Sequence, residues 1–150
     1  MKEGEAKLFD SNYTMALDTK NRFFVPSEYR LNLGTNVILL PSFEDGNDCI
    51  FVYTEDMWPA VFAGIEESVN GDPDGKDAIR FINQGIVHME VDKAGRLTVN
   101  SDLRAFAHIE GKEVKILGNG IHFEIWAPEV WAEKERNRKK RLINTCGLRY

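Results

Sequence analysis

The chain contains an internal repeat that spans most of its length. Three segments recur in the same order: residues 17–30 at 91–104, residues 37–40 at 114–117, and residues 49–58 at 122–131. The first pair, LDTKNRFFVPSEYR and VDKAGRLTVNSDLR, aligns at a constant offset of 74 residues. A unit of about 45 residues buries too little apolar surface to be stable alone. The two copies are therefore expected to pack on each other with pseudo-two-fold symmetry.

Both copies predict the same order of secondary structure. An extended segment, YTMAL or IVHMEV, precedes a tight turn, a second strand, a short helix and a pair of strands joined by a turn. Pro26 and Gly34 bound the first short helix, because proline begins helices well and glycine ends them. Asn100 or Ser101 is the expected N-cap of the second.

Three further helices are predicted in addition to the short helix of each copy. Apolar residues recur on one helical face at Trp58, Val61, Phe62, Ile65 and Val69. Thr54 is the expected N-cap of this helix, residues 76–84 form a second helix, and Pro128 opens a third. The pattern as a whole indicates a mainly β fold with short helices, in the α+β class, with helical extensions.

Length and composition favour a folded domain without a membrane segment. The chain has 150 residues, of which 43% are hydrophobic and 29% charged. No apolar run approaches the roughly 18 residues that a membrane-spanning helix requires. The first twelve residues lack the apolar core of a signal peptide. A cytoplasmic protein is therefore expected.

Charge is distributed unevenly along the chain. Residues 1–75 carry five basic and fourteen acidic residues, a net charge of −9, whereas residues 76–150 carry +4. Much of the basic excess lies in one run, residues 134–141. This run is either a solvated helix end or an arm that adds non-specific phosphate contacts.

Neither a metal site nor an enzymatic site is expected. Cys49 lies in an apolar run and is expected in the core, whereas Cys146 is expected to be exposed. The three histidines show no neighbouring cysteine or carboxylate cluster, so no metal or other cofactor is predicted. No arrangement of nucleophile and base and no glycine-rich phosphate loop is present, so no small-molecule substrate is expected.

The motif that the two copies share best is Asp-x-x-x-Arg, at Asp18–Arg22 and Asp92–Arg96. The aspartate can accept backbone N–H groups of the following turn, and the arginine four residues later can face the same carboxylate. Amides and basic side chains then converge at the loop, which suits phosphate oxygens. The alternative is a purely structural ion pair that locks the turn, and this is the expected role of Asp18 and Asp92.

These motifs, together with FEIWAPEVW near the C-terminus, resemble those of the MraZ family of bacterial transcriptional regulators over about residues 12–133. The resemblance implies two SpoVT/AbrB-type domains in one chain, each a swapped-hairpin β-barrel unit, which together form an intrachain pseudo-dimer. The expected divisions are residues 12–57 for domain 1, 58–85 for a helical connector, 86–129 for domain 2 and 130–150 for a C-terminal helix with a basic tail.

The resemblance also implies a function. Proteins of this family form closed homo-oligomeric rings, associate with the nucleoid and bind short direct repeats in double-stranded DNA upstream of the division and cell-wall gene cluster. Carried over residue by residue, the DNA-binding positions are Thr19, Lys20, Asn21, Arg22, Lys93 and Arg96. The chain departs from the family pattern at Asn21, where glycine is usual, and at Asn100, where proline is common.

Two functions of different classes are therefore considered. The first is a sequence-specific DNA-binding transcriptional regulator that acts as an oligomeric ring. The second is an oligomeric protein-interaction scaffold on the same fold, without specific DNA binding, which the net charge of −5 favours. Retention of oligomer size with loss of DNA binding in an Arg22→Ala variant distinguishes them.

Overall fold

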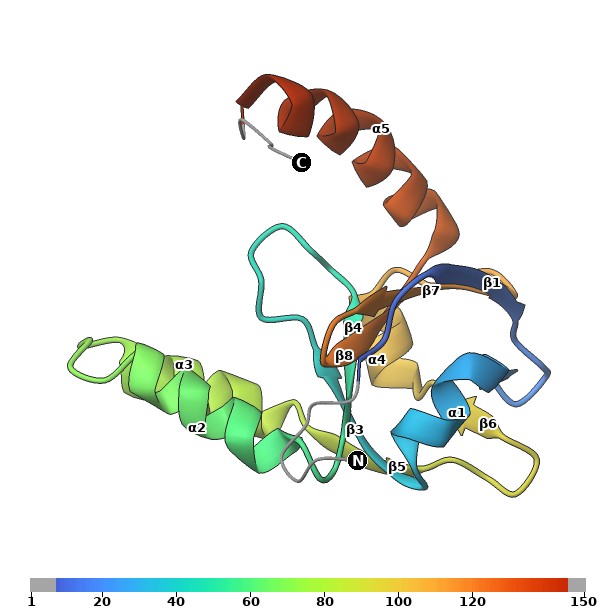
Figure 1. Cartoon of the computed structure of the whole chain (residues 1–150), viewed down its shortest axis with the longest axis horizontal. Helices are drawn as coiled ribbons and strands as arrows, with labels where there is room; N and C mark the ends of the chain where they lie inside the picture. The colour runs from blue at the N-terminus through green and yellow to red at the C-terminus, as the bar shows by residue number, and fades with distance from the viewer. Residues whose placement is uncertain (1–7, 146–150) are drawn as a thin grey trace.

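The computed structural model describes residues 8–145, with side chains as far as residue 137. This part of the chain forms eight strands and five helices (Figure 1). The strands are β1 (Asn12–Ala16), β2 (Arg22–Phe24), β3 (Asn36–Pro41), β4 (Ile50–Thr54), β5 (Val87–Glu90), β6 (Arg96–Thr98), β7 (Glu113–Asn119) and β8 (His122–Trp126). The helices are α1 (Ser27–Leu33), α2 (Trp58–Ser68), α3 (Gly75–Gln84), α4 (Ser101–Phe106) and α5 (Pro128–Thr145).

The strands form one large sheet and one small ribbon. The large sheet has six strands in the order β1-β7-β8-β4-β3-β5, and the ribbon pairs β2 with β6. All of these pairings are antiparallel. The first strand of each repeat pairs with the third strand of the other repeat, β1 with β7 and β5 with β3. The mixed α+β class, with mainly antiparallel strands and short helices, agrees with the sequence prediction.

Both repeats contribute to a single hydrophobic core. Val25 and Leu39 from the first repeat pack in the same cluster as Leu97, Val99 and Ile125 from the second. Since these side chains are at most 1% exposed, neither repeat covers its own apolar surface. The expectation that the two copies pack on each other is thus confirmed.

The opposite face of the large sheet carries a second apolar cluster, to which the start of helix α2 contributes. Alternate residues of β3 point to opposite faces, so that Val37 and Leu39 lie in the shared core whereas Ile38 and Leu40 pack on the other side. Trp58 of α2 belongs to this second cluster. The aromatic residues of the predicted helical face therefore serve packing.

Four of the five helices begin close to where the sequence places them. Helix α1 lies between Pro26 and Gly34, and the Asn100 side chain accepts a hydrogen bond from the Leu103 amide at the start of α4. The predicted N-cap of α2 is wrong. Thr54 is still paired with Val37 in the sheet, so the chain completes a turn before α2 begins at Trp58. In that turn the Thr54 hydroxyl accepts a hydrogen bond from the Met57 amide.

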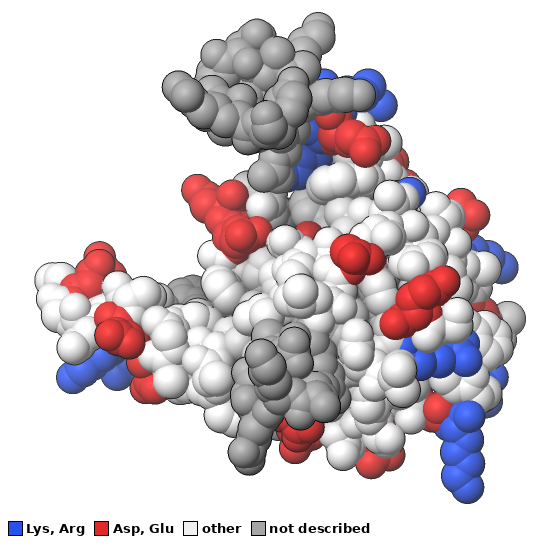
Figure 2. Space-filling model, viewed as in Figure 1, with Lys and Arg blue, Asp and Glu red and all other residues white. Residues whose placement is uncertain are grey.

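Two helical extensions project from the sheet on different sides, the α2–α3 pair and α5 (Figure 1). The loops that join β1 to β2 and β5 to β6 lie together at a third side, on the right in Figure 1. Figure 2 shows basic side chains along this right-hand edge, with acidic side chains among them. The side chains of residues 138–141 in the basic run, and Cys146, lie outside the described part. Within residues 8–145, no helix is both long and apolar enough to cross a bilayer.

Candidate nucleic-acid interface

The β2–β6 ribbon supports both copies of the Asp-x-x-x-Arg motif. Each strand has three residues, and Phe23 pairs with Leu97 at the centre of the ribbon. These two side chains face the core and are 1% and 0% exposed. Their burial fixes the ribbon against the body of the protein, so its outer face and its two end loops are held in place.

The outer face of the ribbon carries the motif arginines. Arg22 lies opposite Thr98 at one end, and Phe24 lies opposite Arg96 at the other. Residues directly opposite each other in an antiparallel pair share one face, and so do residues two apart in a strand. These four side chains therefore line the face that points away from the core.

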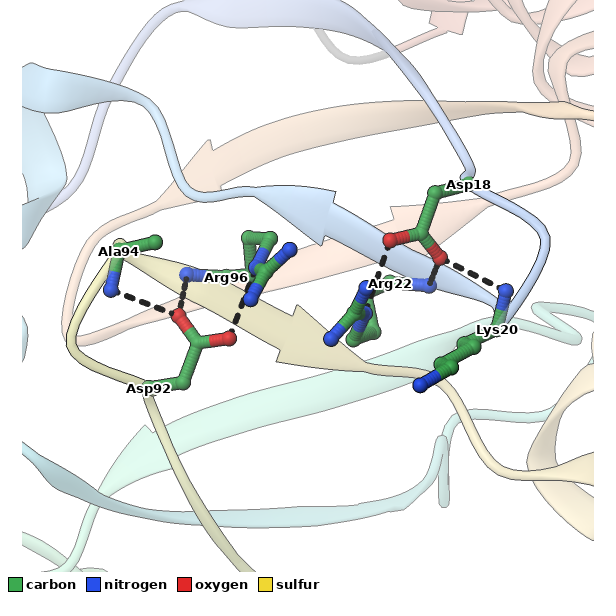
Figure 3. Close-up of polar contacts among 6 residues, drawn as sticks. All are labelled: Asp18, Lys20, Arg22, Asp92, Ala94 and Arg96. Atoms are coloured by element: carbon green, nitrogen blue, oxygen red, sulfur yellow. Dashed lines mark hydrogen bonds and ion pairs between the residues drawn. The ribbon is translucent and has the colours of Figure 1, made fainter.

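The first loop is closed by the Asp18 carboxylate (Figure 3). Its Oδ1 atom accepts hydrogen bonds from the backbone amides of Lys20 and Arg22, each at 2.9 Å, and its Oδ2 atom accepts one from Arg22 Nε at 2.8 Å. The backbone adds hydrogen bonds from the Asn21 amide to the Asp18 carbonyl and from the Asp18 amide to the Arg22 carbonyl. Asn21 takes a positive φ of 59°, which asparagine tolerates better than most residues.

The second loop repeats this network with the same donors (Figure 3). Oδ1 of Asp92 accepts from the amides of Ala94, at 3.0 Å, and Arg96, at 2.8 Å, while Oδ2 accepts from Arg96 Nε at 2.8 Å. Gly95 stands at the position of Asn21, with a φ of 89°. The two loops occupy opposite ends of the ribbon, as the pseudo-two-fold relation requires.

Hydrogen bonding lowers the pKa of both aspartates. For Asp18 the principal cause is the bond from the Arg22 backbone amide, and for Asp92 it is the bond from the Arg96 amide. Partial burial opposes the shift, and the guanidinium groups add to it. Both carboxylates are therefore ionised at neutral pH and hold their arginines in fixed orientations.

Each motif arginine is anchored through Nε only. The ion pairs are Arg22 Nε–Asp18 Oδ2 and Arg96 Nε–Asp92 Oδ2, and among the described side chains, residues 8–137, neither arginine forms a second ion pair. The terminal η nitrogens are thus left for a ligand. The arginine side chains are 25% and 30% exposed, so an approaching anion can reach them.

The remaining predicted positions lie at the loop tips. Thr19, Lys20 and Lys93 are exposed, and Asn21 is half-buried. The structure thus brings the predicted DNA-binding residues to two loops of one ribbon, four in the first loop and two in the second. The turn geometry expected from the sequence is present in both loops, and contact with DNA remains a prediction.

A second group of residues, beside the second loop, was not predicted from the sequence. Arg30, in the last turn of α1, lies with its guanidinium carbon 6.0 Å from the centre of the Phe24 ring. Arg96 lies at the same distance from that ring. The alignment of the repeats indicates this difference, because Phe24 of the first copy aligns with Thr98 of the second, and the two side chains are chemically unlike.

Two of the histidines each have one carboxylate neighbour, which was not predicted from the sequence. His122 Nε2 lies 2.9 Å from Glu124 Oε2, and His108 Nε2 lies 2.9 Å from Asp48 Oδ2. Glu124 is 5% exposed. Burial disfavours its charged form, but hydrogen bonds from His122, Asn119 and Trp126 outweigh this and lower its pKa. Within the described residues, no group of three or more histidine, cysteine or acidic residues is arranged to hold a metal ion.

Cys49 is fully buried, as the sequence predicts. Burial raises the pKa of its thiol, so this cysteine is a neutral core residue.

Comparison with known proteins identifies the family. A sequence model of the family described as "MraZ protein, putative antitoxin-like" matches residues 83–144, which hold the second repeat and most of α5. A relative named transcriptional regulator MraZ, from Caldanaerobacter subterraneus subsp. tengcongensis, is 36% identical over 129 residues, which cover 83% of this chain and 85% of the relative.

Two further relatives with the same name extend this match. The protein from Clostridium acetobutylicum is 34% identical over 126 residues, which cover 84% of this chain and 86% of the relative. The protein from Alkaliphilus metalliredigens is 31% identical over 126 residues, with 84% and 85% covered. Identity at this level extends over most of both chains. The chain belongs to the MraZ family.

Proposed function

We propose that the protein is a DNA-binding transcriptional regulator that contacts DNA through the two loops of the β2–β6 ribbon. The observation that carries this proposal is the paired geometry of Arg22 and Arg96. Each is anchored through Nε, and its η nitrogens form no ion pair with the side chains of residues 8–137. A planar guanidinium with two unused NH2 groups can bind a phosphate or a guanine edge in a bidentate manner. The names of the relatives, transcriptional regulator MraZ, support the same function.

The contacting residues in this proposal are those of the loops. Thr19, Lys20, Asn21 and Arg22 act from the first loop, and Lys93 and Arg96 act from the second. Asp18 and Asp92 position the arginines and do not touch DNA. No enzymatic step forms part of the proposal.

The proposed assembly is a closed homo-oligomeric ring that binds short direct repeats upstream of the division and cell-wall gene cluster, in the cytoplasm and at the nucleoid. A single chain of net charge −5 binds DNA weakly, because phosphate contacts dominate affinity. Several copies that present the same loops toward one DNA molecule raise the affinity through multivalency. Two observations support an assembly of several copies. The chain belongs to the MraZ family, and acidic side chains lie among the basic ones on the surface in Figure 2.

We further propose that the fold is a pair of SpoVT/AbrB-type units in swapped-hairpin arrangement, with domains at residues 12–57 and 86–129. The exchange of first strands between the repeats supports this, since β1 pairs with β7 and β5 with β3. The β2–β6 ribbon supports it as well, because it joins one strand from each unit.

The first test is an Arg22→Ala substitution measured against DNA from the region upstream of the protein's own gene. We expect the wild type to shift this DNA specifically and less strongly at higher salt. The variant should lose about 5- to 150-fold in affinity, since one bidentate contact is worth about 1–3 kcal/mol. Arg80→Ala is the matched control, because Arg80 pairs with Asp77 on α3, away from the ribbon, and its removal changes the charge equally.

Oligomer size, measured by light scattering on the same samples, separates the two functions considered. Unchanged size with abolished DNA binding supports the regulator. If the wild type binds no DNA specifically while remaining folded and oligomeric, the protein-interaction scaffold becomes the better description. If Arg22→Ala changes the oligomer, the motif has a structural role instead.

A further inference from the structure

The end of the ribbon at the second loop holds one arginine more than the motif provides. Arg30 Nε donates a 2.8 Å hydrogen bond to the carbonyl oxygen of Val25, immediately after β2. Its guanidinium and that of Arg96 each lie 6.0 Å from the centre of the Phe24 ring. Phe24 is 49% exposed and Arg30 is exposed, so this group forms part of the surface.

Gly95 provides the space in which Arg30 lies. A Cβ atom at this position would come within 2.6 Å of the Arg30 guanidinium carbon and within 2.8 Å of its Nε. Any residue other than glycine would therefore displace the side chain. The Gly95 carbonyl also accepts a hydrogen bond from the Val25 amide, at 2.9 Å, which ties the loop to the same backbone segment that anchors Arg30.

The first-loop end has the same backbone but a different arrangement of side chains. The Val99 amide donates to the Asn21 carbonyl at 2.9 Å, which repeats the bond from Val25 to Gly95. Arg104 occupies in α4 the position that Arg30 occupies in α1. Asn21 carries a Cβ atom where Gly95 has none, and by the correspondence of the two repeats this atom stands at the position that would meet Arg30 at the other end.

Arg104 differs accordingly from Arg30. It is only half exposed, and its Nε is buried without an acceptor among the residues that the structure describes. The residue that aligns with Phe24 is Thr98, which offers no aromatic face. The two ends of the ribbon are thus inequivalent, and the second is the one that presents two arginines over an exposed ring.

We propose that Arg30 is a further phosphate-binding residue, which contacts the backbone of duplex DNA beside the second loop together with Arg96. This proposal rests on the proposed function. Arg30 is anchored through Nε, as the motif arginines are, so its guanidinium is oriented before DNA arrives and little side-chain entropy is given up on binding. Arg30 and Arg96 both lie near the exposed Phe24 ring, and their two positive charges attract a phosphate that approaches this end of the ribbon.

The test compares Arg30→Gln with Arg104→Gln, its counterpart in the other repeat. Both remove one positive charge and keep a polar side chain with N–H donors. The dissociation constant for the upstream DNA is measured by fluorescence anisotropy at four or more salt concentrations, with the whole chain in its native assembly. The slope of log K against log salt falls in magnitude by about 0.9 for each phosphate that the protein no longer neutralises. We expect this decrease, for each chain that engages DNA, in Arg30→Gln and not in Arg104→Gln.

An Arg30→Lys variant and thermal melting guard against a purely structural explanation. Lysine retains the charge, so we expect the wild-type salt slope with an affinity several-fold lower, because lysine cannot form the bidentate fork. A decrease in stability alone lowers the fraction of active protein and leaves the slope unchanged.

Failure of this proposal differs from failure of the proposed function. A wild-type protein without salt-sensitive binding contradicts the function itself. If the wild type binds and Arg30→Gln keeps its salt slope, or if both glutamine variants reduce the slope by the same amount, Arg30 has no special contact with phosphate and the proposal is wrong.

Discussion

The two ends of the β2–β6 ribbon have nearly the same backbone and different surfaces. At the second-loop end, Gly95, Phe24 and Arg30 form a layered group in which a guanidinium lies over both the loop and the ring. At the first-loop end, Asn21 and Thr98 stand in the equivalent positions, and the described residues form no such group there.

This difference shows how an internal repeat can keep its fold and divide its tasks. The hydrogen bonds that close each loop come from two backbone amides and from the arginine Nε to the aspartate, and all of these are present in both copies. Residues outside this network are under no such constraint. They can change the surface chemistry at one end without disturbing the turn.

The largest effect on stability is expected from substitutions on the inner face of the ribbon, which both ends share. Phe23→Ala should lower the free energy of unfolding by about 3–5 kcal/mol and Leu97→Ala by about 2–5 kcal/mol, because each leaves a cavity in a fully buried site. Since one core serves both repeats, each variant should unfold in a single transition. Denaturant titrations followed by circular dichroism and by tryptophan fluorescence, at equal protein concentration, measure this.

The outward-facing Phe24→Ala variant is the control for this pair. It should cost no more than about 2.5 kcal/mol, the sum of a small surface effect and the removal of two cation–π interactions, with Arg30 and with Arg96. Two separate transitions in Phe23→Ala, one for each repeat, would show that the halves fold independently.

A smaller effect is expected from rebuilding the second-loop arrangement at the first loop. The double variant Asn21→Gly with Thr98→Phe supplies the missing space and the missing ring beside Arg104. We expect the salt slope of DNA binding to rise in magnitude by about 0.9 for each engaged chain. Adding Arg104→Gln should abolish this increase. A folded double variant with the wild-type slope would mean that space and ring do not suffice to place the arginine.

The smallest difference between the ends is expected in their response to acid. The folded pKa values of Asp18 and Asp92 are lowered from an unfolded value of about 3.9, so both carboxylates stabilise the fold above that pH. This contribution disappears as the pH falls through the folded pKa values, below about 4. Asp18→Asn and Asp92→Asn should therefore melt below the wild type at pH 7 and approach it at pH 3.

Melting temperatures between pH 3 and pH 7 check this expectation. The two variants should behave alike, because their aspartates accept from equivalent donors. A gap between wild type and variant that stays constant down to pH 3 would show that these carboxylates are not the titrating groups.

Much of the fold could be predicted because short-range residue patterns determine where its strands and helices lie. The alternation of Val87, Met89 and Val91 with polar residues marks a strand, and Pro26 and Gly34 mark a helix, and the structure confirms both. The predicted start of α2 is wrong, because a threonine before a helical pattern resembles an N-cap whether or not its strand continues. Only the pairing of Thr54 with Val37 decides that.

The candidate site could be predicted in part for the same reason. The closure of each loop by its aspartate depends on residues within four positions of one another, so the spacing of Asp18 and Arg22 is enough to predict it. Arg30 comes within reach of Gly95 across 65 positions of sequence, and no local pattern reports such a distance. The carboxylate partners of His108 and His122 were not predicted either, although Glu124 lies only two residues from His122.

The amino-acid sequence alone specified the repeat, the alternation of strands, the two closed turns and the family, since each depends on residue type and short-range spacing. The tertiary structure decided which strand pairs with which, because exchange between the repeats depends on covering one shared core. It also decided the inequality of the two ends. That inequality follows from whether one Cβ atom occupies a space shared by two segments far apart in the chain, and only their packing brings those segments together.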